Sequence, residues 1–413
     1  MPKLLRIHNR LIVGGPTLNV LNLTKHLQPD FETLLVVGEK DLHEKDASEM
    51  AKNMGIIPVV IPEMGRAIHP LKDYSSYWKL RKVIKYFKPD IVHTHAAKPG
   101  AVGRFAAATA KIPVIVHTYH GHVFHSYFSK TKTGVYVNIE RALGLHTNAL
   151  VAISPRQKEE LSQTFRIARP DKFRVVPLGF DLSPFQQSQS EKRARFREQY
   201  GIGDEDIVIG IIGRLVHIKN HSLFLKALDF VLKHTTRKVR AFIIGDGETR
   251  EPLFCQAAHL KIPYNRPGGQ YDATKPLTFT SWRTDVDVIN AGLDIICLTS
   301  LNEGTPVSLI EAQAANKAIV STNVGGISDV VKHNQTGLLS DITNPDEFCS
   351  NLLDVVEDDE LRAALGKNGS WVLEQYDVAR LADDFRKLYY ELLDNKGVEY
   401  VRTVFKEQKI WNF

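Results

Sequence analysis

Residues 293–312 read LDIICLTSLNEGTPVSLIEA, and this stretch decides the fold. It opens with an apolar run, residues 293–298, whose length suits a buried strand. Gly304 then permits a tight turn, and Pro306 stands where a helix begins, because its fixed φ and missing N–H suit the first helical turn. A buried strand, a turn and a helix in immediate succession predict one βα unit of a parallel sheet.

The same βα rhythm continues along the chain on both sides of this unit. A polar stretch at 184–205 interrupts it and indicates a linker followed by a surface helix. The turn-rich residues 261–276 are expected to be a surface insertion. We therefore predict an α/β protein with two Rossmann-like domains, at 1–183 and 184–376, and a helical segment, 377–413, that packs back on the first domain. Strands are expected at 4–9, 33–38, 57–61, 91–95, 114–119, 149–153, 173–176, 207–212, 241–244, 277–280, 295–299 and 318–322.

Composition agrees with an ordered two-domain protein. The 413 residues exceed what one hydrophobic core usually supports. No apolar run is long enough to span a bilayer and no signal peptide is evident, so we expect a cytoplasmic protein.

The net charge of +6 is uneven, because residues 1–183 carry +11 and residues 184–413 carry −5. A basic first domain suits nucleic acid, anionic lipid or a phosphorylated substrate, and also a merely solvated surface. Three cysteines without CxxC spacing indicate reduced core residues.

Small and charged residues follow several strands, at the sheet edge where ligands bind in such folds. Glycine turns follow four of the strands. Arg214 and Lys219 suit a diphosphate, since one offers a fixed fork of donors and the other a mobile charge. Glu303 lies at the mouth of the proposed site, and Glu311, eight positions further on and in the second turn of the helix, is placed to accept hydrogen bonds from a ribose diol. The small and turn residues predicted to bind the same ligand are Gly14, Gly15, Gly213, Gly245, Asp246, Gly304, Thr305 and Pro306.

Histidines are concentrated in the first domain, and we expect no metal among them. His93 and His95 point to one side of a strand, but no carboxylate or cysteine of ligand spacing accompanies them. His120 follows the strand at 114–119 and is the residue expected to contact a substrate held by the other domain. Beyond it, residues 123–132 mix Val123, Phe124, Tyr127 and Phe128 with Lys130 and Lys132, which favours an anionic membrane or a lipid-linked acceptor, or simple core packing.

These motifs, in this order, resemble glycosyltransferase family 4 over nearly the whole chain, with the stretch from Glu303 to Glu311 the most specific. The resemblance implies the GT-B architecture, two Rossmann-like domains facing across a cleft. It implies that Arg214 and Lys219 bind the diphosphate of a nucleotide sugar, that Glu311 binds the ribose, and that Glu303 with the amides of Gly304 and Thr305 binds the sugar. It also implies that His120 contacts that sugar from the other domain.

The resemblance further implies transfer with retention of anomeric configuration, without a metal or other cofactor. The stretch from His93 to His125 is similar to bacterial members that build surface polysaccharides on polyprenyl diphosphate carriers. A UDP-sugar donor, a lipid-linked or saccharide acceptor and peripheral contact with the inner face of the cell membrane are therefore expected, and nucleic acid is not. His217 departs from the family's commoner acidic residue.

Other function classes stay open on the residues alone. A nucleotide-dependent oxidoreductase is disfavoured, because no strand is followed by a complete GxGxxG with its acidic partner. A non-catalytic binder of nucleotide sugars, a GT-B epimerase and a synthase acting on a soluble sugar phosphate use the same architecture.

Overall fold

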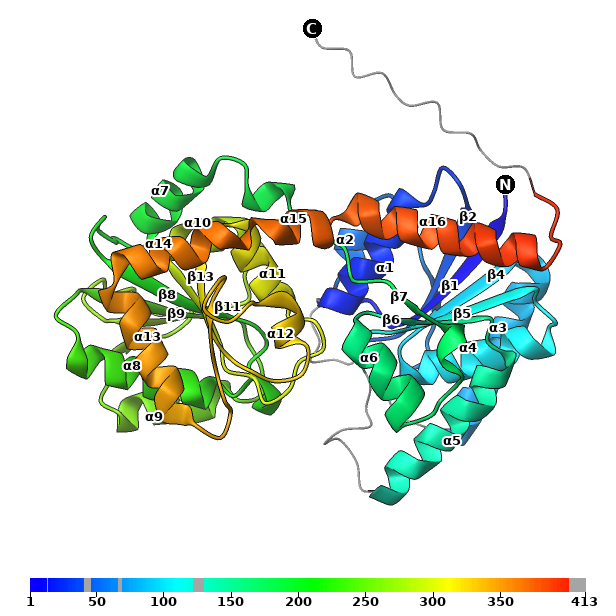
Figure 1. Ribbon diagram of the computed structural model, residues 1–413, viewed down its shortest axis with the longest axis horizontal. Helices are drawn as coiled ribbons and strands as arrows, with labels where there is room; N and C mark the ends of the chain where they lie inside the picture. Colours follow the sequence, from blue (N-terminus) through cyan, green and yellow to red (C-terminus); the bar gives the residue numbers. More distant parts are fainter. Residues whose placement is uncertain (13, 41–45, 66–68, 122–129, 401–413) are drawn as a thin grey trace, which may run out of the picture. The chain divides into compact units, whose positions relative to one another are not determined.

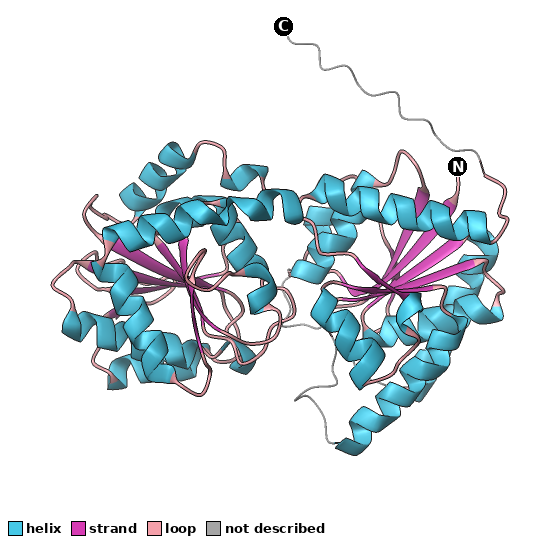
Figure 2. Ribbon diagram, viewed as in Figure 1, coloured by secondary structure: helices cyan, strands magenta, loops and turns pink. Residues whose placement is uncertain are grey.

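The computed structural model describes residues 1–12, 14–40, 46–65, 69–121 and 130–400. The chain forms two compact units, one of residues 1–180 with 376–413 and the other of residues 181–375. Each is built on a parallel seven-stranded sheet with helices on both faces, drawn as magenta strands between cyan helices in Figure 2. The predicted α/β fold class is confirmed.

The first unit has the strand order β3-β2-β1-β4-β5-β6-β7 (Figure 1). Its strands are largely buried because helices cover both sides of the sheet. Its strands are β1 Lys3–Arg10, β2 Glu32–Gly38, β3 Val59–Ile61, β4 Ile91–His95, β5 Val114–Tyr119, β6 Ala149–Ala152 and β7 Phe173–Val175. Its helices are α1 Gly15–His26, α2 Ser48–Asn53, α3 Pro70–Phe87, α4 Ala97–Thr109, α5 Lys130–His146, α6 Pro155–Glu159 and α16 Val378–Asn395.

The C-terminal helix α16 belongs to this first unit. Its apolar stripe, which includes Phe385, Leu388 and Tyr389, packs on buried residues of the sheet and of α1, among them Leu4 and Leu23. Spacing of three and four residues places these side chains on one face of the helix. Asp377 caps the start of α16, since its carboxylate accepts hydrogen bonds from the N–H groups of the first turn.

The second unit has the strand order β10-β11-β9-β8-β12-β13-β14. Its strands are β8 Ile207–Ile212, β9 Val239–Ile244, β10 Tyr264–Asn265, β11 Leu277–Ser281, β12 Ile295–Leu298, β13 Ala318–Thr322 and β14 Leu338–Ser340. Its α-helices are α7 Gln189–Gln199, α8 His221–His234, α9 Arg250–His259, α10 Val286–Gly292, α11 Val307–Ala314, α12 Ile327–Val330, α13 Pro345–Glu357, α14 Asp359–Lys367 and α15 Val372–Gln375.

Two expectations from the sequence are wrong. The segment 261–276 is not only a surface insertion, because it contributes edge strand β10, and the buried Asn265 side chain bonds Thr278 on β11. A two-residue strand is too short to show a period in the sequence. Cys297 and Cys349 are buried as expected, but Cys255 is exposed on α9. In the described part of the chain, no helix is both long and apolar enough to cross a membrane.

Candidate functional site

The candidate site of the second unit lies where its strand order reverses. β8 and β12 are neighbours in the sheet but far apart in sequence, so the connections from them run in opposite directions. The loops leaving their carboxyl ends therefore diverge and leave room between them, which is where open α/β sheets bind ligands. The loop after β8 holds Arg214 and Lys219, and the loop after β12 holds Glu303.

Lys219 and Glu303 join these two loops directly. The Lys219 Nζ lies 2.5 Å from Glu303 Oε1, and the Ser300 hydroxyl donates to the same oxygen at 2.6 Å. Backbone contacts support the pair, since the Thr299 hydroxyl donates to the Lys219 carbonyl oxygen at 3.0 Å. The Lys219 and Glu303 side chains are only 21% and 10% exposed, so they form a partly desolvated ion pair. Ser300 is a site residue that the sequence reasoning missed, although it stands only three positions before Glu303.

Glu311 lies in the second turn of α11, and its side-chain carboxyl makes no hydrogen bond or ion pair within the described part of the chain. Burial raises the pKa of its carboxyl to about 8. The helix starts at Val307, with Pro306 as its N-cap residue and no side-chain cap, so the amides near Gly304 and Thr305 are left for other acceptors. An acid that is half-buried and has no partner is unusual in a structural role and is a candidate for ligand binding.

Arg214 is exposed, and its guanidinium has no partner among the described residues. His217, where the sequence departs from the family pattern, is also exposed, at the start of the 3₁₀ turn His217–Lys219. Arg214 is thus a free cation beside a Lys219 that is already paired.

Two pairs of glycines let neighbouring loops touch at this edge. A Cβ on Gly245 would lie 1.9 Å from the carbonyl oxygen of Gly213, and one on Gly247 2.3 Å from that of Leu215. A Cβ on Gly325 would lie 2.0 Å from the carbonyl oxygen of Glu303. Backbone hydrogen bonds run through the same contacts, from the Gly326 N–H to the Glu303 carbonyl at 3.0 Å, for example. The glycines therefore hold the site's loops in place.

Replacing Gly325 by alanine is expected to destabilise the second unit by roughly 2–4 kcal/mol, because the left-handed backbone and the contact with Glu303 each add a cost. The backbone φ of Gly325 is +55°. Thermal unfolding should show the loss as a lower melting temperature of this unit. Gly268→Ala is the matched control, since Gly268 also has positive φ but an added Cβ would meet nothing within 4 Å. If both variants lowered the melting temperature equally, a role for the close contact between Gly325 and the Glu303 carbonyl oxygen would be contradicted.

The carboxylate of Asp246 is occupied by the protein itself. It accepts hydrogen bonds from Arg250 Nη1 at 2.9 Å, the Ser281 hydroxyl at 2.7 Å and the Gly247 N–H at 2.8 Å. These contacts tie the loop after β9 to β11 and α9. Asp246 thus organises the loop beside Gly245, and direct contact of its side chain with a ligand stays a prediction.

The remaining predicted residues lie in the first unit, at the carboxyl ends of β1 and β5. His120 follows β5, and its Nε2 is 2.9 Å from Nδ1 of His95, which ends β4. Burial lowers the pKa of His120 to about 4, with Arg6 adding to the effect, so the ring is neutral near pH 7. Gly14 is the N-cap residue of α1, with open space around its Cα. His95 was considered only as a metal ligand in the sequence, and its contact with His120 was not foreseen.

His93 is hydrogen-bonded within the first unit. His93 bonds the Tyr389 hydroxyl of α16 at 2.6 Å and the Thr118 hydroxyl at 2.8 Å. The rings of His93 and His95 lie 4.0 Å apart, on one side of β4 as predicted. Among the described residues no three His, Cys, Asp or Glu side chains gather as a metal site would need. His122, His125 and the aromatic cluster at 123–128 lie outside the described residues.

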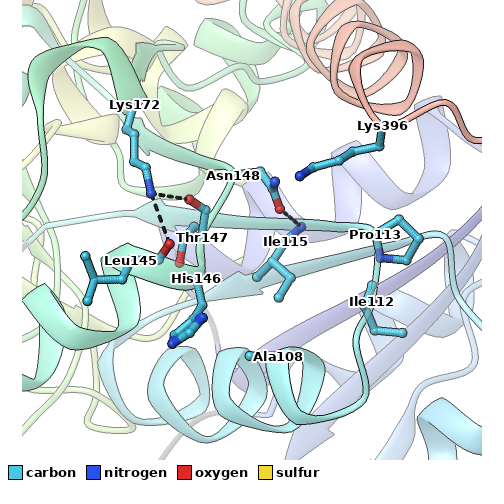
Figure 3. Close-up of a pocket in the computed structure, with 10 residues that line it drawn as sticks. All are labelled: Ala108, Ile112, Pro113, Ile115, Leu145, His146, Thr147, Asn148, Lys172 and Lys396. Carbon is cyan, nitrogen blue, oxygen red and sulfur yellow. Dashed lines mark hydrogen bonds between the residues drawn. The ribbon is translucent and has the colours of Figure 1, made fainter.

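A pocket of about 450 Å³ lies at the opposite end of the first sheet, at the amino ends of β5, β6 and β7 (Figure 3). Its Lys172 ammonium donates to the carbonyl oxygens of Gly144, Leu145 and Thr147 at the end of α5. Lys172 therefore closes a helix C-terminus, where a cation is favoured. Its role is structural, and the pocket lies at the other end of the first sheet from His120.

Comparison with known families accounts for both halves of the chain. A model described as Glycosyltransferase Family 4 matches residues 13–184, and one described as Glycosyl transferases group 1 matches residues 192–371. The second match contains every predicted site residue of the second unit, and the first contains Gly14, Gly15 and His120.

Individual relatives agree with these matches. The chain is 29% identical over 338 residues to the UDP-Gal:alpha-D-GlcNAc-diphosphoundecaprenol alpha-1,3-galactosyltransferase of Escherichia coli, covering 81% of this chain and 84% of that protein. It is 23% identical to the N,N'-diacetylbacillosaminyl-diphospho-undecaprenol alpha-1,3-N-acetylgalactosaminyltransferase of Campylobacter jejuni, covering 85% and 90%. The crystal structure of HepE from Anabaena in complex with UDP and glucose shares the fold, with a TM-score of 0.77, 20% identity, and 95% and 100% coverage.

Proposed function

Because the chain belongs to the family 4 glycosyltransferases, which have the GT-B fold, we propose that it transfers a sugar from a UDP-sugar to a lipid-linked or saccharide acceptor, with retention of anomeric configuration. The acceptor serves the synthesis of a bacterial surface polysaccharide. The observation that carries the proposal is the Lys219–Glu303 ion pair at the strand reversal, beside the exposed Arg214 and the unpartnered Glu311.

Each site residue then has a chemical task. Arg214 and Lys219 neutralise the diphosphate, whose negative charge grows as the bond to the sugar breaks. Glu311 accepts hydrogen bonds from the ribose diol. Glu303 and the free amides near Gly304 bind the sugar hydroxyls. When the donor binds, the sugar hydroxyls replace Lys219 as the partner of Glu303, and Lys219 moves to the diphosphate.

The acid–base chemistry is assigned to the substrates. In a retaining transfer the departing diphosphate accepts the proton of the acceptor hydroxyl on the same face of the sugar, and the acceptor oxygen bonds the anomeric carbon. The protein's contribution is then position and charge stabilisation. His120, neutral and held by His95, approaches the sugar as a hydrogen-bonding group and carries no charge.

Relatives support the choice of acceptor. The Escherichia coli and Campylobacter jejuni proteins are named for saccharides on undecaprenol diphosphate, and a further relative from Staphylococcus aureus is named for capsular polysaccharide biosynthesis. We therefore place the acceptor on a polyprenyl diphosphate carrier and the reaction at the inner face of the cell membrane.

Calorimetric titration with UDP, GDP and ADP tests the donor site. We expect micromolar binding of UDP alone and at least tenfold weaker binding to Glu311→Ala, because a ribose hydrogen bond to a charged group is worth about 1.5–3 kcal/mol. UDP-sugars are then screened for turnover with polyprenyl-diphosphate-linked acceptors. Failure of every nucleotide to bind would overturn the proposed function, and equal UDP affinity in the variant would overturn the role of Glu311.

The pH dependence of UDP binding gives a second test of Glu311. The free carboxyl, with its pKa near 8, is mostly protonated at neutral pH. Ribose hydroxyls that donate to it stabilise the ionised form and lower its pKa, so binding releases a proton. UDP affinity is therefore expected to rise as the pH increases through the neutral range, by up to about tenfold per pH unit, and to level off above pH 8.

The control for this test is Glu311→Gln, which keeps the shape of the side chain and cannot ionise. The UDP phosphates titrate in the same way against both proteins, so only the difference between the two profiles reports Glu311. Calorimetry in two buffers of different ionisation enthalpy should show more proton release for the wild type than for Glu311→Gln. Identical profiles for the two proteins would contradict the assignment.

A further inference from the structure

Helices α3, α4 and α5 lie near one another in the first unit (Figure 1), and residues from all three line an apolar groove. Its volume is about 520 Å³, and its lining residues include none of the candidate site residues. Tyr74 and Tyr77 line it from α3, Val102 and Phe105 from α4, and Ile139 from α5.

Large apolar side chains around this groove are exposed to solvent. Tyr74 is 65% exposed, Phe105 54%, Trp78 48% and Ile139 43%. The aromatic rings form a continuous stripe, because Tyr77 contacts both Trp78 and Phe105 with centroids 5.3 Å apart. Monomeric soluble proteins rarely expose apolar patches of this kind unless a partner or a membrane covers them.

The charge around the groove is one-sided. Helix α3 carries five Lys and Arg residues against one acid, Asp73, and that acid is paired with Lys98 on α4 at 2.5 Å. The acid of α5, Glu140, is buried in an ion pair with Arg104. Lys82 and Lys85 are exposed on α3, without partners among the described residues. Lys82 and Lys85 stand four and seven positions after Trp78 and therefore share the face of α3 that carries this exposed ring, whereas both of these acids are neutralised.

We propose that this face of α3, α4 and α5 docks on an anionic lipid bilayer. Tyrosine and tryptophan side chains favour the membrane interface, where their rings meet acyl chains and their polar atoms meet headgroups. Lysines on the same helix face are attracted to anionic headgroups. A second copy of the chain fits poorly, since a symmetric contact through this face would bring the lysines of two copies together.

This surface deepens the proposed function and rests on it for one point, the lipid-linked acceptor that gives docking a purpose. The sequence placed membrane contact at Phe124, Tyr127 and Phe128. The groove provides a surface built from described residues instead. It brings the first unit, which supplies His120, to the membrane.

Co-sedimentation of the full chain with vesicles tests the proposal. We expect binding to phosphatidylglycerol vesicles at low salt and little to phosphatidylcholine vesicles. The double variant Lys82→Glu/Lys85→Glu should lower the partition coefficient by about tenfold or more. Tyr74→Ser/Phe105→Ser should lower it as well, and at high salt too, because that loss does not depend on charge.

Matched controls lie elsewhere on the surface. Ile57→Ser changes an 86% exposed apolar residue outside the groove, and Lys226→Glu reverses an exposed charge on α8. Both should bind vesicles as the wild type does. UDP titration of the wild type and of every variant separates the two proposals. A groove variant that binds UDP normally but no longer binds vesicles supports docking. A wild-type protein that binds vesicles but not UDP contradicts only the proposed function.

Trp78 reports docking directly, since it is one of only four tryptophans. Vesicles with brominated acyl chains should quench its fluorescence, and Trp78→Phe should bind with little quenching. Three results would overturn the proposal: no binding of the wild type to anionic vesicles, equal binding by the groove variants, or equal quenching in Trp78→Phe. A dimer in sedimentation velocity that Phe105→Ser dissolves would also overturn it, in favour of a second copy.

Discussion

Replacing Lys219 by alanine is expected to lower turnover by about 10²–10³-fold while changing the affinity for UDP only a few-fold. The lysine already has a partner in Glu303, so ground-state binding of the diphosphate must replace that contact and gains little. In the transition state the leaving diphosphate carries more charge, and the ammonium then has most to stabilise. Steady-state kinetics with a UDP-sugar, together with UDP calorimetry, measures both quantities.

Two variants serve as controls for this result. Lys219→Arg keeps the charge and should retain more activity than the alanine variant, whereas Lys226→Ala removes an exposed lysine from α8 and should change nothing. Thermal unfolding is needed as well, because Glu303 loses its cation in the alanine variant and keeps only the Ser300 hydroxyl. Wild-type turnover in a folded Lys219→Ala protein would remove Lys219 from the mechanism.

The fold and the main charges of the site were accessible from the sequence for one physical reason. Buried parallel strands are nearly continuous apolar runs, so β8 and β12 were visible, and residues just past a strand's end lie at the ligand-binding edge. That placed Lys219 and Glu303 correctly at one edge. Their direct contact was not predictable, because sequence spacing does not reveal which strands are neighbours.

Other features depend on distances that no local pattern contains. The need for glycine at Gly325 comes from the Glu303 carbonyl oxygen, which is near in space and distant in sequence. His95 and His120 meet because β4 pairs with β5. The carboxylate of Asp246 accepts hydrogen bonds from Arg250, Ser281 and a backbone amide. Its position in a glycine turn of the sequence did not reveal these partners.

The docking face was missed because its helices look ordinary in sequence. In α3, Leu80 and Ile84 are buried while Trp78 is exposed, and a periodic pattern assigns apolar residues to a core by default. Only the exposed fractions reveal the residues that the core leaves out. When a helix carries more apolar residues than its core-facing side can bury, the sequence therefore indicates a second apolar face that is exposed to solvent.

Replacing Glu140 by alanine is expected to destabilise the first unit by about 3–5 kcal/mol, which should lower its melting temperature by roughly 10 °C. The Glu140 carboxylate accepts two hydrogen bonds from Arg104 Nη2, at 2.7 and 2.8 Å, and a third from the Tyr119 hydroxyl at 2.5 Å. Arg104 is 1% exposed, so the variant leaves a buried guanidinium without its counter-charge. Thermal and urea unfolding measure the loss.

The double variant Arg104→Met/Glu140→Leu separates the two contributions, because it removes the stranded charge together with its partner and should recover much of the stability. Lys79→Met is the control for a surface pair, since it breaks only the exposed contact with Glu63 and should cost less than about 1 kcal/mol. Arg104 lies on α4 and Glu140 on α5, so the pair also holds the two helices that form the apolar groove. Glu140→Ala should therefore bind anionic vesicles less tightly even at temperatures where it remains folded. If Glu140→Ala lowered the free energy of unfolding no more than Lys79→Met does, the stabilising role of the buried pair would be contradicted.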